Sequence, residues 1–292
     1  MLIFLRQPAR AALLALGAVP SAAGATQAPA IRDNSFLVEE AYNQDAGVVQ
    51  HAALLHHAGG SAGWQVILAQ EWPLGSQRHQ VSFSMPFAGG SGASGLGDLG
   101  LHYRYQLLGG GEEPLALAPR FSLLAPTGSA EEGTGAGSVG LQVGLPASLA
   151  LGSRFAGHAN AAFTLTPSSE SPTGSRATAL DLGAGASLVW LAAPWVNLLV
   201  EGIWARTEEV VGPGVTAARD EAFLSPGLRF AWNLPGGQQL VPGIAWTIGV
   251  GPSAGAESLL LVYLSFEHSF RRRLTGAEAA AQLGLHPSRQ VR

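Results

Sequence analysis

Three histidines close together in sequence are the first residues of this chain whose types and spacing could do chemistry. His51, His56 and His57 have the crowding that is typical of metal ligands. On a β-strand, however, His51 and His57 share one face while His56 takes the other, and no carboxylate nearby completes a ligand set. We therefore predict no metal site.

Two glycine-rich stretches, 95–100 and 135–140, fit the G-x-G-x-x-G pattern of dinucleotide-binding turns. Such a turn must join a strand to a helix within a βαβ unit, because the helix N-terminus holds the phosphates. Both stretches instead open alternating segments, without a helical pattern after them. We expect no cofactor.

A hydrolase would need a serine and a histidine within hydrogen-bond reach, oriented by a third group. His158 and a serine on a neighbouring strand could form such a pair, but many similar pairs could form in this chain. No G-x-S-x-G elbow occurs in the required strand–turn–helix context. We predict no catalytic residue and no enzyme, with a lipid-acting hydrolase as the enzymatic alternative.

The composition limits what can position these side chains. The 292 residues include 39 Gly, 18 Pro and no Cys, and only 12% are charged, against about 25% in ordinary soluble domains. A hydrophobic share of 47% excludes disorder, and the missing cysteines exclude disulfide scaffolds. Since the net charge is −4, the chain offers no basic surface to nucleic acid.

Apolar and polar residues alternate with a period of two, which is the signature of strands with one apolar and one polar face. The segments 81–87, 155–165 and 228–234 show it most clearly. Cutting at Gly, Pro and Ser clusters gives twelve candidate strands: 47–58, 63–74, 78–88, 96–108, 114–125, 137–151, 154–166, 178–192, 195–208, 220–234, 238–250 and 257–270.

Strand length and loop asymmetry favour a membrane over water. Most candidate strands reach the ~9–11 residues that a tilted strand needs to cross a bilayer. Long connections such as 125–137, 167–177 and 207–219 alternate with tight turns such as 75–77. We therefore predict an all-β fold, a transmembrane antiparallel up-and-down β-barrel of about twelve strands, in the bacterial outer membrane.

The ends of the chain predict its organisation. Residues 1–25 have basic, apolar and small-residue regions in the order of a secretory signal peptide, and no apolar run is long enough for a transmembrane helix. We expect 26–46 to be a periplasmic or plug segment, 47–270 the barrel and 271–292 a periplasmic tail.

Polar residues at inward positions are the candidates for lining a lumen. Their mixed signs predict paired charges rather than a strongly ion-selective pore. The predicted lumen-lining residues are Asp98, His102, Arg104, Arg120, Arg154, His158, Glu201, Arg229 and Glu267.

The segment before the first strand carries a motif with Phe36, Glu39, Glu40, Tyr42, Asn43 and Gln44. Together with the Gly-Leu-Gly-Asp-Leu stretch at 95–99, it resembles the outer-membrane barrel family named after the MetA-pathway of phenol degradation. The resemblance implies a barrel that takes up hydrophobic or aromatic compounds, and it supplies no catalytic or binding residues. The motif could plug the lumen or seal the periplasmic rim; we favour the rim, because plugs of larger barrels are longer.

The function that we predict is a monomeric outer-membrane channel for passive uptake of small hydrophobic or aromatic compounds. Its expected partners are these solutes, outer-membrane lipids and lipopolysaccharide, and not nucleic acid. Two alternatives stay open. One is an outer-membrane lipid-acting hydrolase, and the other is a structural or adhesive barrel with a blocked lumen.

Overall fold

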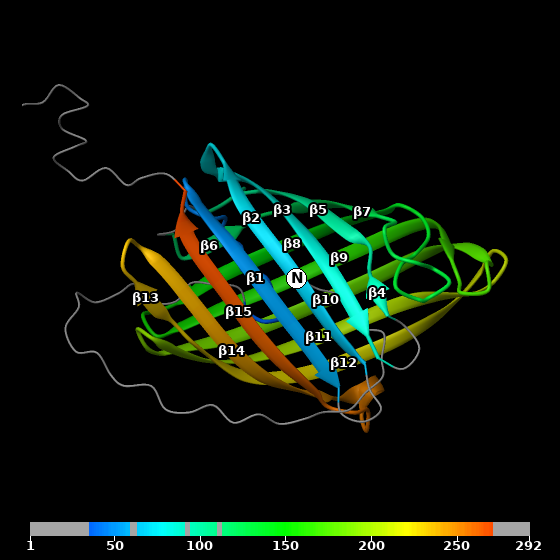
Figure 1. Cartoon of the computed structure of the whole chain (residues 1–292). Helices are drawn as coiled ribbons and strands as arrows, with labels where there is room; N and C mark the ends of the chain where they lie inside the picture. Colours follow the sequence, from blue (N-terminus) through cyan, green and yellow to red (C-terminus); the bar gives the residue numbers. More distant parts are fainter. Residues whose placement is uncertain (1–34, 59–62, 91–93, 110–112, 271–292) are drawn as a thin grey trace, which may run out of the picture.

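The alternating segments form antiparallel strands in the computed structural model, which describes residues 35–58, 63–90, 94–109 and 113–270 (Figure 1). The strands are β1 (Val48–Ala58), β2 (Trp64–Leu74), β3 (Ser76–Gly89), β4 (Gly95–Leu96), β5 (Leu99–Tyr105), β6 (Leu115–Leu117), β7 (Arg120–Ala125), β8 (Gly140–Leu151), β9 (Phe155–Glu170), β10 (Arg176–Ala193), β11 (Val196–Gly212), β12 (Val215–Phe230), β13 (Trp232–Leu234), β14 (Gln238–Gly249) and β15 (Leu259–Ser269).

Pairing between the first and last strands closes the sheet. β1 pairs with β15 along its whole length, and the two lie side by side in Figure 1 as the blue and orange-red arrows. β14 joins β15 to β12, while the short β4, β6 and β13 extend the walls beside β3, β8 and β14. Twelve strands thus form the wall of a closed antiparallel barrel, so the predicted fold class is confirmed.

The two faces of the wall differ as the alternation requires. Leu141 and Phe121 point outward and are about half exposed, with 50% and 55% of their surface accessible. On the neighbouring inward positions Ser122, Gln142 and Thr164 are buried and lie in one cross-strand row. An apolar exterior around a polar interior is the arrangement of outer-membrane barrels, and this is a barrel of the bacterial outer membrane.

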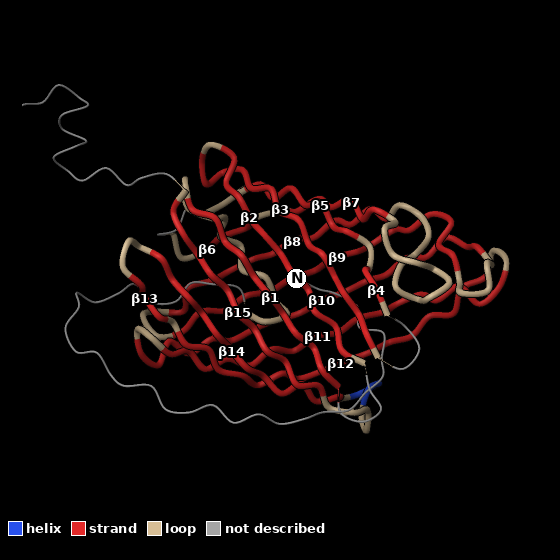
Figure 2. The backbone as a smooth tube through the Cα atoms, in the orientation of Figure 1, coloured by secondary structure: helices blue, strands red, loops and turns tan. Residues whose placement is uncertain are grey.

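Two connections that we predicted as long loops are hairpins instead. β9 continues to Glu170 and β11 to Gly212, so the strands extend past the expected starts of loops 167–177 and 207–219. These longer hairpins project from one end of the barrel in Figure 2. A cross-strand ion pair lies within one of these regions, between Arg176 and Glu170 at 2.7 Å. Polar alternation outside the membrane therefore still favours strands.

Several predictions about the chain ends lie outside the described residues. These are the signal peptide at 1–25, the first part of the segment 26–46 and the tail at 271–292. Among the described residues, no helix has the length and apolar character needed to cross a membrane.

Leu145 in the middle of β8 offers a test of which face meets lipid, because it points outward opposite Ala161 and is 45% exposed. Leu145→Arg should lower the free energy of unfolding by about 2–4 kcal/mol if this position lies near the bilayer midplane. Leu151→Arg is the matched control, because Leu151 is also 45% exposed on the outer face but ends the same strand beside the tight turn, where the expected loss is about 0–1 kcal/mol. Urea unfolding of the protein in lipid vesicles measures both variants, and equal losses would contradict a midplane, lipid-facing position of Leu145.

Candidate functional site

Residues 35–44, which we call the luminal segment, lie inside the barrel. Phe36, Val38 and Ala41 are at most 2% exposed, so the segment is enclosed on all sides. It contacts residues several positions inside the strands, such as Ser187 on β10, whose Oγ lies 2.6 Å from the Oγ of Ser35. The segment therefore crosses the lumen, and our expectation that it rests at the rim is wrong. Ten residues suffice because side chains of the wall reach inward to meet them.

Side chains of the wall satisfy the main chain of the luminal segment. Glu201 on β11 accepts hydrogen bonds from the backbone N–H groups of Leu37 and Val38 through one oxygen, at 2.8 and 2.9 Å. Asn160 on β9 accepts from the N–H of Glu39 at 2.6 Å and donates to its carbonyl oxygen at 2.9 Å. These bonds replace the ladder partners that a strand would supply.

The same pattern continues towards the C-terminal end of the segment. Ser148 on β8 accepts from the N–H of Ala41 at 2.7 Å. Gln106 accepts from the N–H of Asn43 at 2.9 Å and donates to the carbonyl of Ala41 at 2.6 Å. Side chains of the wall thus hold the luminal segment mainly through the segment's own backbone N–H and C=O groups. Most of these contacts therefore do not depend on the side chains of the segment.

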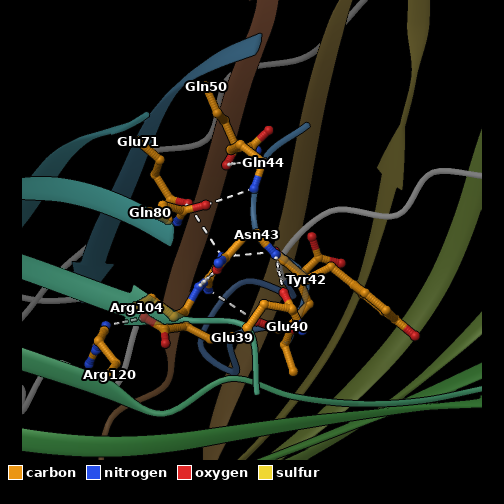
Figure 3. Close-up of polar contacts among 12 residues, drawn as sticks. Glu39, Glu40, Tyr42, Asn43, Gln44, Gln50, Glu71, Gln80, Arg104 and Arg120 are labelled. Carbon is orange, nitrogen blue, oxygen red and sulfur yellow. Dashed lines mark hydrogen bonds and ion pairs between the residues drawn. The ribbon is translucent and has the colours of Figure 1, made fainter. Parts of the chain in front are cut away.

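Arg104 on β5 lies at the centre of the polar contacts in Figure 3. Its guanidinium donates to Asn43 Oδ1 at 2.7 Å and to the carbonyl oxygens of Tyr42 and Glu40 at 2.8 and 3.1 Å. The carboxylate of Glu71 on β2 lies 3.7 Å away and balances its charge. One arginine therefore holds three residues of a segment that has no regular secondary structure.

A second arginine is paired with the segment itself. Arg120 on β7 forms an ion pair with Glu39 and donates to Gln142 Oε1 at 2.6 Å. Both side chains are largely enclosed, so the two form a buried charge pair with polar partners on both sides.

Phe36 is the apolar anchor of the luminal segment. Its ring packs edge-on against Tyr263 on β15, with the ring centroids 5.6 Å apart. Gly227 on β12 and Gly243 on β14 lie directly against the ring, and a Cβ atom at either position would overlap it. These two glycines make room for the aromatic ring inside the barrel.

A cavity remains between the luminal segment and the wall formed by β1, β2, β3, β5, β7 and β15. Its apolar side includes Phe36, Leu54, Ile67 and Tyr263. Its polar side includes Ser82, Ser84, His102, Glu71, Arg104 and Arg120. Since Arg104 faces Glu71 and Arg120 faces Glu39, the two positive charges of the lining meet two negative ones.

Most of the predicted lumen-lining residues do point inward. These are His102, Arg104, Arg120, His158, Glu201, Arg229 and Glu267, each at an inward register position of its strand. The structure does not bring them into one cluster, because they are distributed around the wall. Only Arg104, Arg120 and His102 line the cavity.

Two of the residues that we predicted to line the lumen lie in a turn and a loop instead. Arg154 is exposed in the tight turn before β9, since that turn extends one residue past the strand start that we predicted at 154. Asp98 folds a loop, because its carboxylate accepts from the N–H groups of Gly128 and Ala136 at 2.9 and 2.7 Å. Neither residue is among those that line the cavity.

The predicted site residues do not include four uncharged side chains that also hold the luminal segment, namely Gln80, Gln106, Ser148 and Asn160. The alternation places all four on the inner face, but it does not distinguish them from other inward polar residues. Neutral amides and hydroxyls are the groups that can satisfy a peptide main chain without adding charge to a buried lumen.

The serine–histidine pair considered for hydrolysis exists, with Ser148 Oγ 2.8 Å from His158 Nδ1. In the described part of the chain, no hydrogen bond joins His158 to a carboxylate that could orient it. The same Ser148 Oγ already accepts from the N–H of Ala41. The pair therefore serves to hold the luminal segment. Within the described residues, no three His, Asp or Glu side chains gather closely enough to hold a metal ion.

Comparisons with known proteins agree with this architecture. A family model described as "Putative MetA-pathway of phenol degradation" matches residues 23–266. The chain is similar to the crystal structure of the COG4313 outer membrane channel from Pseudomonas putida F1, at 15% identity and a TM-score of 0.61, over 79% of this chain and 98% of that one. It is similar to the NanC porin at 8% identity and a TM-score of 0.51, over 76% and 99%. No curated protein matches the chain.

The Glu39–Arg120 pair provides a test of how firmly the luminal segment is held. Arg120→Met should destabilise the barrel by about 3–5 kcal/mol, because it leaves the Glu39 carboxylate buried without its charge partner. Glu39→Leu combined with Arg120→Met should recover most of that loss. Urea unfolding of the two single variants and the double variant measures the coupling, and additive losses would show that the pair is not coupled.

Proposed function

Because the chain belongs to the family described as the MetA-pathway of phenol degradation and closes into an outer-membrane barrel, we propose that it is a passive channel for small hydrophobic or aromatic compounds. Passage of this kind needs no chemical step. It needs a continuous route with binding weak enough to release the solute again.

The cavity beside the luminal segment is the observation that carries this proposal. One side of it, with Phe36, Leu54 and Ile67, offers apolar contact to a ring or a short hydrocarbon. The opposite side offers hydroxyl, imidazole and paired charged groups, in which Arg104 and Arg120 are each balanced by a carboxylate. A lining without a strong net charge favours neutral solutes over ions.

The organisation of the chain follows from the same proposal. Residues 1–25 would direct export as a signal peptide, 26–46 would narrow the lumen, 47–270 would form the barrel and 271–292 would lie in the periplasm. The apolar exterior supports contact with outer-membrane lipids, and lipopolysaccharide would meet the exposed hairpins. We propose that the barrel acts as a monomer.

The alternative of a structural or adhesive barrel with a blocked lumen is favoured by one observation. The luminal segment is bonded to the wall along its length, through Glu201, Asn160, Ser148 and Gln106. A segment held this firmly could close the lumen altogether. The two functions differ in whether ions and solutes cross the reconstituted barrel.

Ion current through single barrels in planar lipid bilayers tests the proposal. The intact protein should show a small steady conductance, and small aromatic solutes added to one side should reduce it by occupying the cavity. Sugars of similar mass should reduce it less, because they cannot use the apolar side. Deletion of 33–46 should raise the conductance several-fold and remove the difference between aromatics and sugars.

Bilayers without protein are the control for leakage that the aromatic solutes cause in lipid. A barrel that inserts stably but carries no current, with a deletion variant that carries a large one, would support the blocked alternative. Equal effects of aromatics and sugars on the intact protein would contradict selectivity for aromatic solutes.

A further inference from the structure

One pair of polar side chains inside the barrel has no role in holding the luminal segment. His56 on β1 and Gln65 on β2 are direct cross-strand partners at inward positions. His56 is 3% exposed. Neither of its ring nitrogens has a hydrogen-bond partner, and the side-chain oxygen of Gln65 also lacks one. Three hydrogen-bonding atoms are thus enclosed at one place on the wall and left unused.

The other histidines on the inner face are satisfied. His102 lies between Ser84 and Ser122, at 2.9 and 2.8 Å from their hydroxyl oxygens. His158 is bonded to Ser148 at 2.8 Å. The wall therefore normally supplies a hydroxyl to an inward imidazole, and His56 is the position where a hydroxyl is missing.

The surroundings of this pair are apolar. Leu54 and Ile67, the next inward residues towards the periplasm on the same two strands, are 4% and 1% exposed and line the cavity. Leu261 on β15 faces His56 across the β1–β15 pairing and is 1% exposed. A buried polar group without a partner costs about 1–3 kcal/mol, so an apolar site that keeps three such atoms points to a partner that arrives from outside the chain.

The chemistry of the pair specifies that partner. A neutral imidazole offers one N–H donor and one nitrogen acceptor, and the amide oxygen of Gln65 adds a second acceptor. A hydroxyl group can accept a hydrogen bond from the imidazole N–H of His56 and donate one to the amide oxygen of Gln65, so it can bridge the pair. An anion would lose its hydration here, and neither His56 as a neutral ring nor Gln65 would supply a compensating charge.

We propose that His56 and Gln65 form a subsite that binds the hydroxyl group of a neutral aromatic solute. The ring of the solute lies against Leu54, Ile67 and Leu261. Leu54 and Ile67 also line the cavity, so the solute can pass from the subsite into the cavity. This inference rests on the proposed channel function and makes it specific, because it distinguishes hydroxylated rings from plain hydrocarbons of the same shape.

Phenol and toluene are suitable probes, since they have nearly the same size and differ in a hydroxyl against a methyl group. Block of the single-barrel current gives an apparent affinity for each. For the intact protein, phenol should bind about tenfold more tightly than toluene after correction for hydrophobicity, which is the effect of one to two hydrogen bonds in an apolar site.

His56→Leu and Gln65→Leu should each reduce this preference, and the double variant should abolish it while toluene still blocks. His57→Leu is the matched control, because His57 is the next residue of β1, points to the outer face and pairs with Trp64. It should leave the preference unchanged. If the His56 variant does not assemble, Gln65→Leu alone carries the test.

The outcomes separate this inference from the proposed function. If no aromatic solute blocks the current, the proposed function fails. If phenol and toluene block the intact protein equally, only water occupies the pair and the subsite is refuted while the channel stands. If phenol is preferred and the preference survives both substitutions, the hydroxyl binds elsewhere and the assignment to His56 and Gln65 is overturned.

Discussion

Every main-chain N–H and C=O group must find a partner where water is absent, and this constraint shapes both the wall of the barrel and its contents. The wall meets it by closing, since β1 and β15 pair along the seam and leave no open edge in the membrane. The luminal segment meets it differently. It has no neighbouring strand, so carboxylate, amide and hydroxyl side chains such as Glu201, Asn160 and Ser148 take the place of a ladder.

This second solution explains why the inner face is polar but nearly balanced in charge. A wall that held the segment with charge alone would bury unpaired ions, which costs several kcal/mol for each. The chain uses neutral groups for most contacts and places its two central arginines where carboxylates face them, Arg104 with Glu71 and Arg120 with Glu39. The same balance leaves the neighbouring cavity suited to neutral solutes, so holding the segment and selecting the solute depend on one set of residues.

The sequence predicts the fold well because a period of two is a strong and local signal. All twelve crossing strands lie within the predicted segments or extend them, and the largest differences are the strand ends up to Glu170 and Gly212, which we predicted as loops. The site is harder to predict for a physical reason. A side chain that holds a peptide main chain needs only an amide or hydroxyl in the right place, and Gln106 or Asn160 looks like any other inward polar residue until the path of the segment is known.

The pair His56 and Gln65 is informative in comparison with the other inward histidines. Where the chain supplies its own partners, as Ser84 and Ser122 do for His102, both ring nitrogens of the imidazole are hydrogen-bonded. At His56 the cross-strand partners Leu261 and Gln65 supply neither a hydroxyl nor a charge. A pair of unsatisfied neutral side chains beside an apolar surface creates a place of higher affinity for a hydroxylated ring. The strength of that binding is limited by the one or two hydrogen bonds that a hydroxyl can make there.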